Sequence, residues 1–344
     1  MDNGTEVATN EGSNQLSTTI VYTTFGVFGI AGNGLVLLVI FLVDDLNSVT
    51  NLFIANQSLI DFLTSVFIIA LYVVPLPPIP IDRPTLARFL CRFWYTGYPF
   101  WSLIVASSLN LTLMTLERFC AVFFPIRFRS QPNSRCMKLI ATLPWAIGFL
   151  FQLSSGFFAH LEDNRCIFTF FSNPLFRRVF QPVAIFLEFI LPVLVMLIVY
   201  TSIVIKLRSD GMRAFDSPRL RTRVGAASRP QQAIDYRSRA RRNTIKTMLI
   251  VSLFFIVCWS LNQVLFIVFS CCGGGVDLNS LLYQISVFMG FGNMWINPFI
   301  YSFQYRWFQK GLRKVFCKKT RSRHSKEMPT ISTAKTGSNE TVSV

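Results

Sequence analysis

Charged residues are scarce in this chain, and that scarcity excludes an ordinary water-soluble domain. Asp, Glu, Lys and Arg make up only 15% of its 344 residues, whereas soluble domains carry about 25%. Hydrophobic residues make up 52%, and the mean hydropathy is +0.46. Most of the chain therefore prefers lipid to water.

Histidine is rarer still, and the residues of a catalytic or metal centre are missing from the sequence. The two histidines, His160 and His324, stand at loop and tail positions. No arrangement of His, Cys and acidic residues has the spacing of a metal site or a catalytic triad. We therefore expect neither an enzyme nor a cofactor.

Long apolar runs dominate what is present. Seven of them reach the roughly 20 residues that a helix needs to cross a bilayer, and they are too continuous for the alternating strands of a β-barrel. Because lipid offers no partner to an unpaired backbone group, helices are expected. The sequence predicts an all-α membrane protein, a seven-transmembrane helix bundle over 16–303. The expected helices are 16–43, 52–76, 93–116, 137–158, 179–205, 245–270 and 279–303.

The segments outside the bundle follow from composition. Residues 1–15 form a polar N-terminal tail, residues 304–317 a short amphipathic helix beside the membrane, and residues 318–344 a tail rich in Ser, Thr and Lys that is expected to be disordered. The basic loop 206–246 is expected to be mobile in its middle and helical at both ends.

Basic residues predict the orientation. Of the 33 Lys and Arg residues, 27 follow helices 3, 5 and 7, and the remainder lie in the loops on the other side. The positive-inside rule puts the N-terminus outside the cell and the C-terminus in the cytosol of a multi-pass plasma membrane protein. The net charge of +16 is spread over connecting segments, so lipid rather than nucleic acid is the expected partner.

One short motif stands in each apolar run, and together the motifs identify a family. In chain order they are Gly32-Asn33, Asp61, Glu117-Arg118-Phe119, Trp145, Pro192 with Tyr200, Cys258-Trp259, and Asn297-Pro298-Phe299-Ile300-Tyr301. From about residue 26 to residue 317 the chain resembles the rhodopsin-like (class A) G-protein-coupled receptors, most closely their peptide-receptor or orphan branches. The resemblance implies a receptor that binds an extracellular ligand and activates a heterotrimeric G protein, with arrestin and receptor kinases as further partners.

The resemblance also implies roles for individual residues. Arg118 is locked to Glu117 and is released on activation to meet the G protein; the alternative is that it only snorkels to the lipid head groups. Tyr200 and Tyr301 swing inward in the active state, or else are packing aromatics. The remaining residues of the activation path are Trp259, Asn297 and Pro298.

Asp61 lies in the middle of a helix, where a charge is costly and usually functional. In the family this position, together with Ser107, Asn293 and Asn297, holds a sodium ion. The alternative is a protonated Asp61 with a structural role.

The sequence departs from the family in three places, and the mildest is Glu117-Arg118-Phe119 in place of the Asp-Arg-Tyr signature, a tolerated variant. Leu261 replaces the proline that kinks helix 6, which puts the size of that helix's opening movement in doubt. Cys91 lies 27 residues before Arg118, two more than is usual, so we expect a bulge or a shifted start in helix 3.

Other classes of membrane protein fit less well. A transporter or channel predicts an inverted repeat and several intramembrane charges, but no repeat is apparent, and Asp61 and Glu188 are the only acids plainly within the runs. A retinal protein needs a lysine in helix 7, and 279–303 contains none.

The ligand pocket is predicted at the outer ends of the helices. Because 93–116 contains no acid, an amine ligand is disfavoured unless it pairs with Glu188. Glu188 is expected to face the interior, either as a helix clamp with Gln263 or as a partner for a basic group of the ligand. The candidate pocket residues are Phe100, Glu188, Asn262 and Gln263.

Modifications are expected at several positions. Cys91 and Cys166 lie outside, where oxidising conditions favour a disulfide over free thiols; Cys271 and Cys272 lie near the same surface without an evident partner. Asn3-Gly4-Thr5 is a glycosylation acceptor. Cys317 is either a palmitoylation site or an unmodified cysteine.

Overall fold

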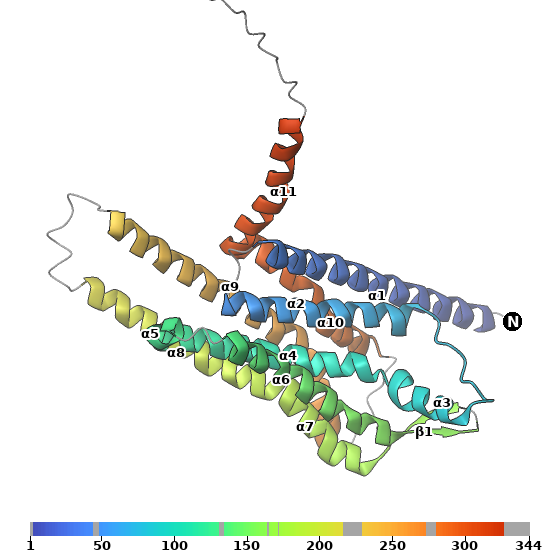
Figure 1. Ribbon diagram of the computed structural model, residues 1–344. Coiled ribbons are helices and arrows are strands. Elements are labelled where there is room, and N and C mark those ends of the chain that lie inside the picture. Colours follow the sequence, from blue (N-terminus) through green and yellow to red (C-terminus); the bar gives the residue numbers. More distant parts are fainter. Residues whose placement is uncertain are drawn as a thin grey trace, which may run out of the picture.

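The computed structural model describes residues 3–43, 48–130, 134–163, 165–170, 172–215, 229–272 and 280–326, and these form an elongated bundle of helices (Figure 1). Six helical spans in these ranges are long and apolar enough to cross a membrane. They are Leu16–Leu42, Val49–Val73, Pro84–Phe123, Arg135–Phe158, Phe176–Ser209 and Arg242–Phe269.

The helices are interrupted by short turns of π or 3-10 geometry. Helix 1 is α1 (Asn3–Leu42), helix 2 is α2 (Val49–Ile68) with a π-turn at Ile69–Val73, and helix 4 is α6 (Ser134–Gln152) with a 3-10 turn at Leu153–Phe158. Helix 5 comprises a π-turn at Phe176–Phe180, α7 (Gln181–Ile185), a π-turn at Phe186–Ile190 and α8 (Leu191–Phe215). Helices 6 and 7 are α9 (Arg229–Cys272) and α10 (Leu281–Gln304), and α5 (Pro125–Ser130) follows helix 3.

The seventh helix of the bundle is α10, and polar side chains lie on the face that it turns toward the bundle interior. Asn293 and Asn297 are both buried, and α10 packs against α1, α2 and α9. Asn33 of α1 donates a hydrogen bond of 2.9 Å to the carbonyl of Met294, which joins the first and seventh helices. The seven-helix bundle is therefore confirmed.

Helix 3 has the predicted irregular start. It comprises α3 (Pro84–Phe89), a π-turn at Leu90–Tyr95 and α4 (Tyr98–Phe123). Gly97 lies at the break with φ +67, a conformation that glycine adopts freely. The wide π-turn and this break accommodate the two extra residues between Cys91 and Arg118, so the expected bulge is confirmed.

The central position of α4 follows from its packing partners. It contacts α2, α6 and α8, and nearly all of its side chains from Ser102 to Thr115 are buried. Gly148 allows α6 to lie close to α4, since an added Cβ there would stand 3.1 Å from the backbone nitrogen of Ala106.

A two-stranded sheet, which the all-α prediction missed, follows helix 4. Strands β1 (Ala159–Glu162) and β2 (Arg165–Phe168) pair antiparallel, with Leu161 opposite Cys166. Each strand has only four residues, too few for an alternating pattern to stand out in the sequence. Asp163 takes φ 45 in the turn, a conformation that Asp tolerates better than most residues.

The first and last helices extend well beyond their predicted boundaries. α1 begins at Asn3 rather than near residue 16, because extending a formed helix costs little and no proline interrupts residues 3–15. α11 (Arg306–Lys326) runs nine residues beyond the predicted 304–317, so residues 318–326 are helical rather than disordered, while residues 327–344 of the tail lie outside the described residues. Its later part is basic and contains no proline or glycine after Gly311.

The ends of the basic loop between helices 5 and 6 are helical as predicted. α8 ends at Phe215 and α9 begins at Arg229, while the loop's middle lies outside the described residues. α8 and α9 project past the other helices at the end of the bundle opposite the N-terminus, and α11 leaves the bundle at that same end (Figure 1).

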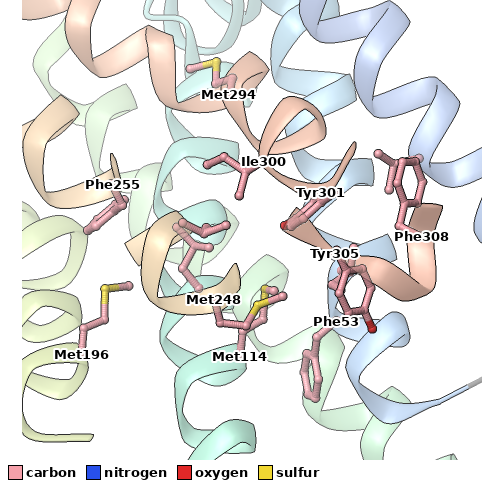
Figure 2. Close-up of a cluster of buried hydrophobic side chains, with 14 of the residues drawn as sticks. Phe53, Met114, Met196, Met248, Phe255, Met294, Ile300, Tyr301, Tyr305 and Phe308 are labelled. Carbon is pink, nitrogen blue, oxygen red and sulfur yellow. The ribbon is translucent and has the colours of Figure 1, made fainter. Parts of the chain in front are cut away.

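A large apolar cluster runs through the core of the bundle. Met114 of α4, Met248 of α9 and Tyr301 of α10 belong to it (Figure 2), and each is nearly or fully buried. Burying an apolar side chain stabilises a fold in water by about 2 kcal/mol, but within lipid the close packing itself supplies the stabilisation. This cluster positions the buried polar residues described below.

Candidate functional site

An open cavity lies among helices 3 to 7 at the end of the bundle that carries the β-hairpin. It holds about 210 Å³ of space. Its walls are aromatic and apolar with a few convergent polar side chains, the usual composition of a small-molecule or peptide site. The lining includes Trp101, Phe176, Phe180, Gln181, Glu188, Trp259, Asn262, Gln263, Phe266 and Tyr283.

Three of the four predicted pocket residues line this cavity. The carboxyl group of Glu188 is hydrogen-bonded to the side chain of Gln263, so the predicted partner is in place. Asn262 instead donates to the hydroxyl of Ser286 on α10, at 3.2 Å. Trp259 lines the same cavity and is 5% exposed.

The fourth predicted residue, Phe100, does not line the cavity. Its ring is fully buried and packs against Tyr72 and Phe291, with ring centroids 5.7 and 5.1 Å apart. The neighbouring residue Trp101 reaches the cavity in its place. Counting along the helix found the inward face correctly, but aromatic side chains from α10 and helix 2 cover Phe100.

Gln181 is a cavity residue that the sequence analysis missed. Its side chain is buried, and within the described part of the chain neither its amide oxygen nor its amide nitrogen has a hydrogen-bond partner. A glutamine with proline next to it at the start of a helix carries no sequence signal for such a role.

The disulfide between Cys91 and Cys166 is present, with Cα atoms 5.5 Å apart. It joins the irregular start of helix 3 to strand β2, and it therefore holds the hairpin beside the cavity mouth. Cys271 and Cys272 lie at the end of α9, and their side chains fall outside the described part, as do those of Asn3 and Cys317.

Asp61 lies at the centre of a buried polar cluster. This is expected because an acidic side chain within the membrane is costly unless it has polar partners. Its Oδ2 accepts a hydrogen bond from Asn297 Nδ2 at 2.9 Å, which links helix 2 directly to helix 7. Its Oδ1 accepts from Ser107 Oγ at 3.2 Å and from Gln57 Nε2 at 3.0 Å. Asn293 is buried as well, but its Oδ1 has no partner among the described residues.

These residues do not fit the sodium site that the resemblance implied. A hard cation needs oxygen atoms with free lone pairs pointing at it, yet N–H donors reach both carboxylate oxygens of Asp61. Gln57, which stands one helical turn before Asp61, supplies the unexpected donor. Its sequence signal was a glutamine in the middle of a transmembrane helix, where an amide needs a partner.

Arg118 is buried near the C-terminal end of α4 and pairs with Glu117. Thr50 of α2 bonds to both members of the pair, donating to Glu117 Oε1 at 3.1 Å and accepting from Arg118 Nη2. Among the described side chains, Glu117 is the only acid in an ion pair with Arg118. Only 6% of Arg118 is exposed, which is not the geometry of a side chain that snorkels to the head groups.

The two predicted tyrosines are buried near this end of the bundle. The hydroxyl of Tyr200 accepts a hydrogen bond from Ser252 of α9 at 3.4 Å. Tyr301 is fully buried, and its hydroxyl has no partner within the described ranges. Pro298 lies inside α10, about one turn before Tyr301.

The inner end of α9 is fixed by Asn243, a residue that the sequence analysis also missed. Its side chain donates to the carbonyl of Gln304 at 2.8 Å and accepts from the amide nitrogen of Arg306 at 3.1 Å. Leu261, in place of the usual proline, leaves α9 as one continuous helix from Arg229 to Cys272.

Comparison with known proteins agrees with this geometry. The sequence pattern of the family described as 7 transmembrane receptor (rhodopsin family) matches residues 32–301. The chain is 24% identical over 325 residues to galanin receptor 2a of Danio rerio, covering 92% of this chain and 82% of the relative. It is 25% identical over 312 residues to somatostatin receptor type 2 of Mus musculus, covering 87% and 76%.

A third relative, somatostatin receptor type 5 of Bos taurus, is 26% identical over 333 residues, which is 92% of this chain and 81% of the relative. Because the family pattern covers more than half of the chain and includes the residues of helices 1 to 7 described above, the chain belongs to the rhodopsin family of seven-transmembrane receptors.

Proposed function

We propose that this G-protein-coupled receptor recognises a peptide in the cavity lined by Gln181, Glu188 and Gln263. The observation that carries the proposal is the pair of amide groups left open there. Both polar atoms of Gln181 and the Oε1 of Gln263 are buried without a partner in the described part of the protein, and both residues line the cavity.

Unpartnered amides suit a peptide ligand because a peptide backbone offers both donors and acceptors. A buried polar group without a partner costs about 1–3 kcal/mol, and a ligand that supplies the missing partner recovers that free energy. The aromatic walls formed by Trp101, Phe176, Phe180 and Phe266 suit the side chains of such a ligand. The relatives named above, a galanin receptor and somatostatin receptors, support the same class.

Glu188 restricts the ligand further. Among the described residues it is the only acid that lines the cavity, and its hydrogen bond to Gln263 leaves lone pairs available. A ligand with a basic side chain or an amino group would complete the site. Trp259, which lines the same cavity and belongs to α9, would then contact the bound ligand and transmit ligand binding as a movement of that helix.

The cavity and the N-terminus face the outside of the cell in this proposal. The support is the basic charge, which gathers at the opposite end, on α11, on the last turns of α8 and on the first turns of α9. A basic surface faces the cytosol in multi-pass proteins. The N-terminal residues 1–15, with Asn3 as a glycan acceptor, would then be extracellular.

Activation would release Arg118 at the inner end. The Glu117–Arg118 pair is screened from solvent and held by Thr50, so opening α9 would expose the guanidinium to the G protein. Tyr200 and Tyr301 would move inward to stabilise the open form, since Tyr301 has no hydrogen bond to lose in the described structure. Asp61, through Asn297, would connect the cavity end to this change.

The cytosolic tail would serve regulation. It carries Ser and Thr residues suited to receptor kinases and then to arrestin, and Cys317 on α11 would accept a palmitoyl chain beside the membrane.

A peptide screen tests the proposed function. Cells expressing the receptor would be exposed to a peptide library with G-protein activation as the readout, and Arg118→Ala at equal surface expression would serve as the inactive control. We expect peptides with a basic group to activate the receptor and to lose potency on Gln181→Leu. Activation by apolar or acidic small molecules alone, with no peptide active, would refute the proposal.

A further inference from the structure

The amide of Gln57 lies between Asp61 and Ser107. Its Nε2 is 3.0 Å from Asp61 Oδ1 and 2.6 Å from Ser107 Oγ, and Ser107 Oγ is itself 3.2 Å from the same carboxylate oxygen. All three residues are buried. We propose that this amide takes the place of a cation between Asp61 and Ser107, so that the core of this receptor does not bind sodium.

The hydrogen-bond count supports the proposal. Each carboxylate oxygen has about two lone pairs. Those of Asp61 Oδ1 are taken by Gln57 and Ser107, and one of Oδ2 is taken by Asn297. A cation would meet N–H groups on both sides of the carboxylate, and N–H groups repel it.

The orientation of the Gln57 amide is set by a series of hydrogen bonds that begins on helix 4. The indole N–H of Trp145 can only donate, and it donates to Asn56 Oδ1 at 2.9 Å. Asn56 must therefore turn its Nδ2 toward Asn110 Oδ1, at 2.8 Å, and it also reaches the carbonyl of Ala141 at 3.0 Å.

Asn110 completes the series. With its Oδ1 occupied by Asn56, its Nδ2 faces Gln57 Oε1 at 2.8 Å. Gln57 is left with only its Nε2 to offer to Asp61. A reversed Gln57 would place two N–H groups of Gln57 and Asn110 against each other, and a buried donor without an acceptor is costly.

Unpartnered acceptors remain on α10 and on Asp61 itself. Oδ1 of Asn293 and Oδ1 of Asn297 have no partner among the described residues, and Asp61 Oδ2 retains one lone pair. These are the atoms that sodium would have to use if it bound in spite of Gln57, and the experiment must detect that case.

The experiment measures the unfolding temperature of the purified, detergent-solubilised receptor in sodium chloride and in choline chloride at equal ionic strength. It needs no ligand, so it is independent of the proposed peptide function. We expect no sodium-dependent shift for the wild-type receptor. Gln57→Leu removes the terminal amide while keeping an apolar branch, and we expect sodium to raise its unfolding temperature by about 2 °C or more, the scale of shift for a bound ligand in a domain of this size.

The double variant Gln57→Leu with Asp61→Asn is the matched control, because it opens the same space without the charge that attracts the ion. It should show no sodium-dependent shift. Two outcomes overturn the proposal: a sodium-specific shift in the wild-type receptor, or no shift in a folded Gln57→Leu.

If Gln57→Leu does not fold, ²³Na line broadening on the wild-type receptor and on Asp61→Asn decides instead. Equal broadening by the two proteins supports the proposal, since the carboxylate then binds no sodium. Broadening that is larger in the wild-type receptor and is lost in Asp61→Asn overturns it.

Discussion

The side chain of Asn243, on α9, donates a hydrogen bond of 2.8 Å to the carbonyl of Gln304, the last residue of α10. Its Oδ1 also accepts from the amide nitrogen of Arg306, at 3.1 Å. One side chain thus ties the inner end of helix 6 to the junction between helix 7 and α11. An outward movement of helix 6 has to break both bonds.

Asn243→Ala should therefore raise ligand-independent signalling. Each hydrogen bond contributes about 1 kcal/mol net, so losing both favours the open form by about 30-fold. The measurement is basal G-protein activity at equal surface expression. Asn243→Asp keeps the acceptor for Arg306 but loses the donor, and it should give an intermediate value; basal activity that is unchanged in both variants would show that the contact does not restrain helix 6.

Arg118→Ala should abolish G-protein activation while the protein still reaches the cell surface. In the proposed mechanism the guanidinium is the group that the opened bundle presents, and in this structure it is held by Glu117 and Thr50. Arg118→Lys is the informative companion, because a lysine keeps the charge but not the planar fork of donors. We expect it to signal weakly, and full signalling by Arg118→Ala would remove this residue from the coupling mechanism.

Replacing Cys91 or Cys166 by Ala should lower surface expression and thermal stability. The bond joins segments 75 residues apart in sequence, and loss of a native disulfide typically costs about 2–5 kcal/mol. The double variant should be no worse than either single variant, since one bond is lost in each case. Additive losses would mean that the two cysteines act separately.

The sequence predicted the bundle because lipid allows few folds. It predicted Asp61 because a charge in the middle of a transmembrane helix is costly and usually functional, and it predicted Arg118 because the motif around it resembles that of a receptor family. The irregular start of helix 3 was likewise predictable from the two extra residues between Cys91 and Arg118, although not its form. A count along the chain cannot say whether a bulge, a break or both will absorb the excess.

What the sequence concealed are the contacts that depend on which side chains meet. In the sequence, Gln57 and Asn110 look like ordinary polar residues of helices. Their hydrogen bonds to Asp61 and Asn56 appear only once the helices are packed, and these bonds connect the four side chains into one network. Phe100 was expected in the pocket because its position faces inward, but Tyr72 and Phe291 cover it. Asn243 acts through backbone groups of Gln304 and Arg306, which leave no mark in the sequence.

Trp145 begins the series of hydrogen bonds that leads to Gln57, and it gives a prediction far from the cavity. Trp145→Phe keeps an aromatic ring beside Phe149 but removes the indole donor to Asn56. Asn56 is then free to reverse, and the preference of Gln57 for its present orientation weakens. We expect a loss of thermal stability of about 1 kcal/mol, the net value of one hydrogen bond, measured by heating the purified receptor, whereas stability equal to wild type would mean that the donor does not anchor the series.

The hydrogen bond between Glu188 and Gln263 is compatible with two roles for Glu188, as a clamp between helices or as a ligand contact. A single substitution separates the two roles. As a clamp between helices 5 and 6, the pair needs only shape and hydrogen bonding, which Glu188→Gln retains. As a contact for a basic ligand, Glu188 needs its charge, which Glu188→Gln removes. An activating peptide with a basic group should then lose about 1.5–3 kcal/mol of binding free energy, the range for hydrogen bonds to charged groups.

The measurement is the potency of such a peptide on both receptors at equal surface expression. Gln263→Leu is the companion variant, since it removes the clamp partner but leaves the carboxylate in the cavity. If charge recognition is the role of Glu188, potency falls about 10- to 100-fold in Glu188→Gln and changes less in Gln263→Leu. Because both variants break or alter the same hydrogen bond, a purely structural clamp would instead give the larger loss in Gln263→Leu, and equal potency on wild type and Glu188→Gln would remove Glu188 from the binding site.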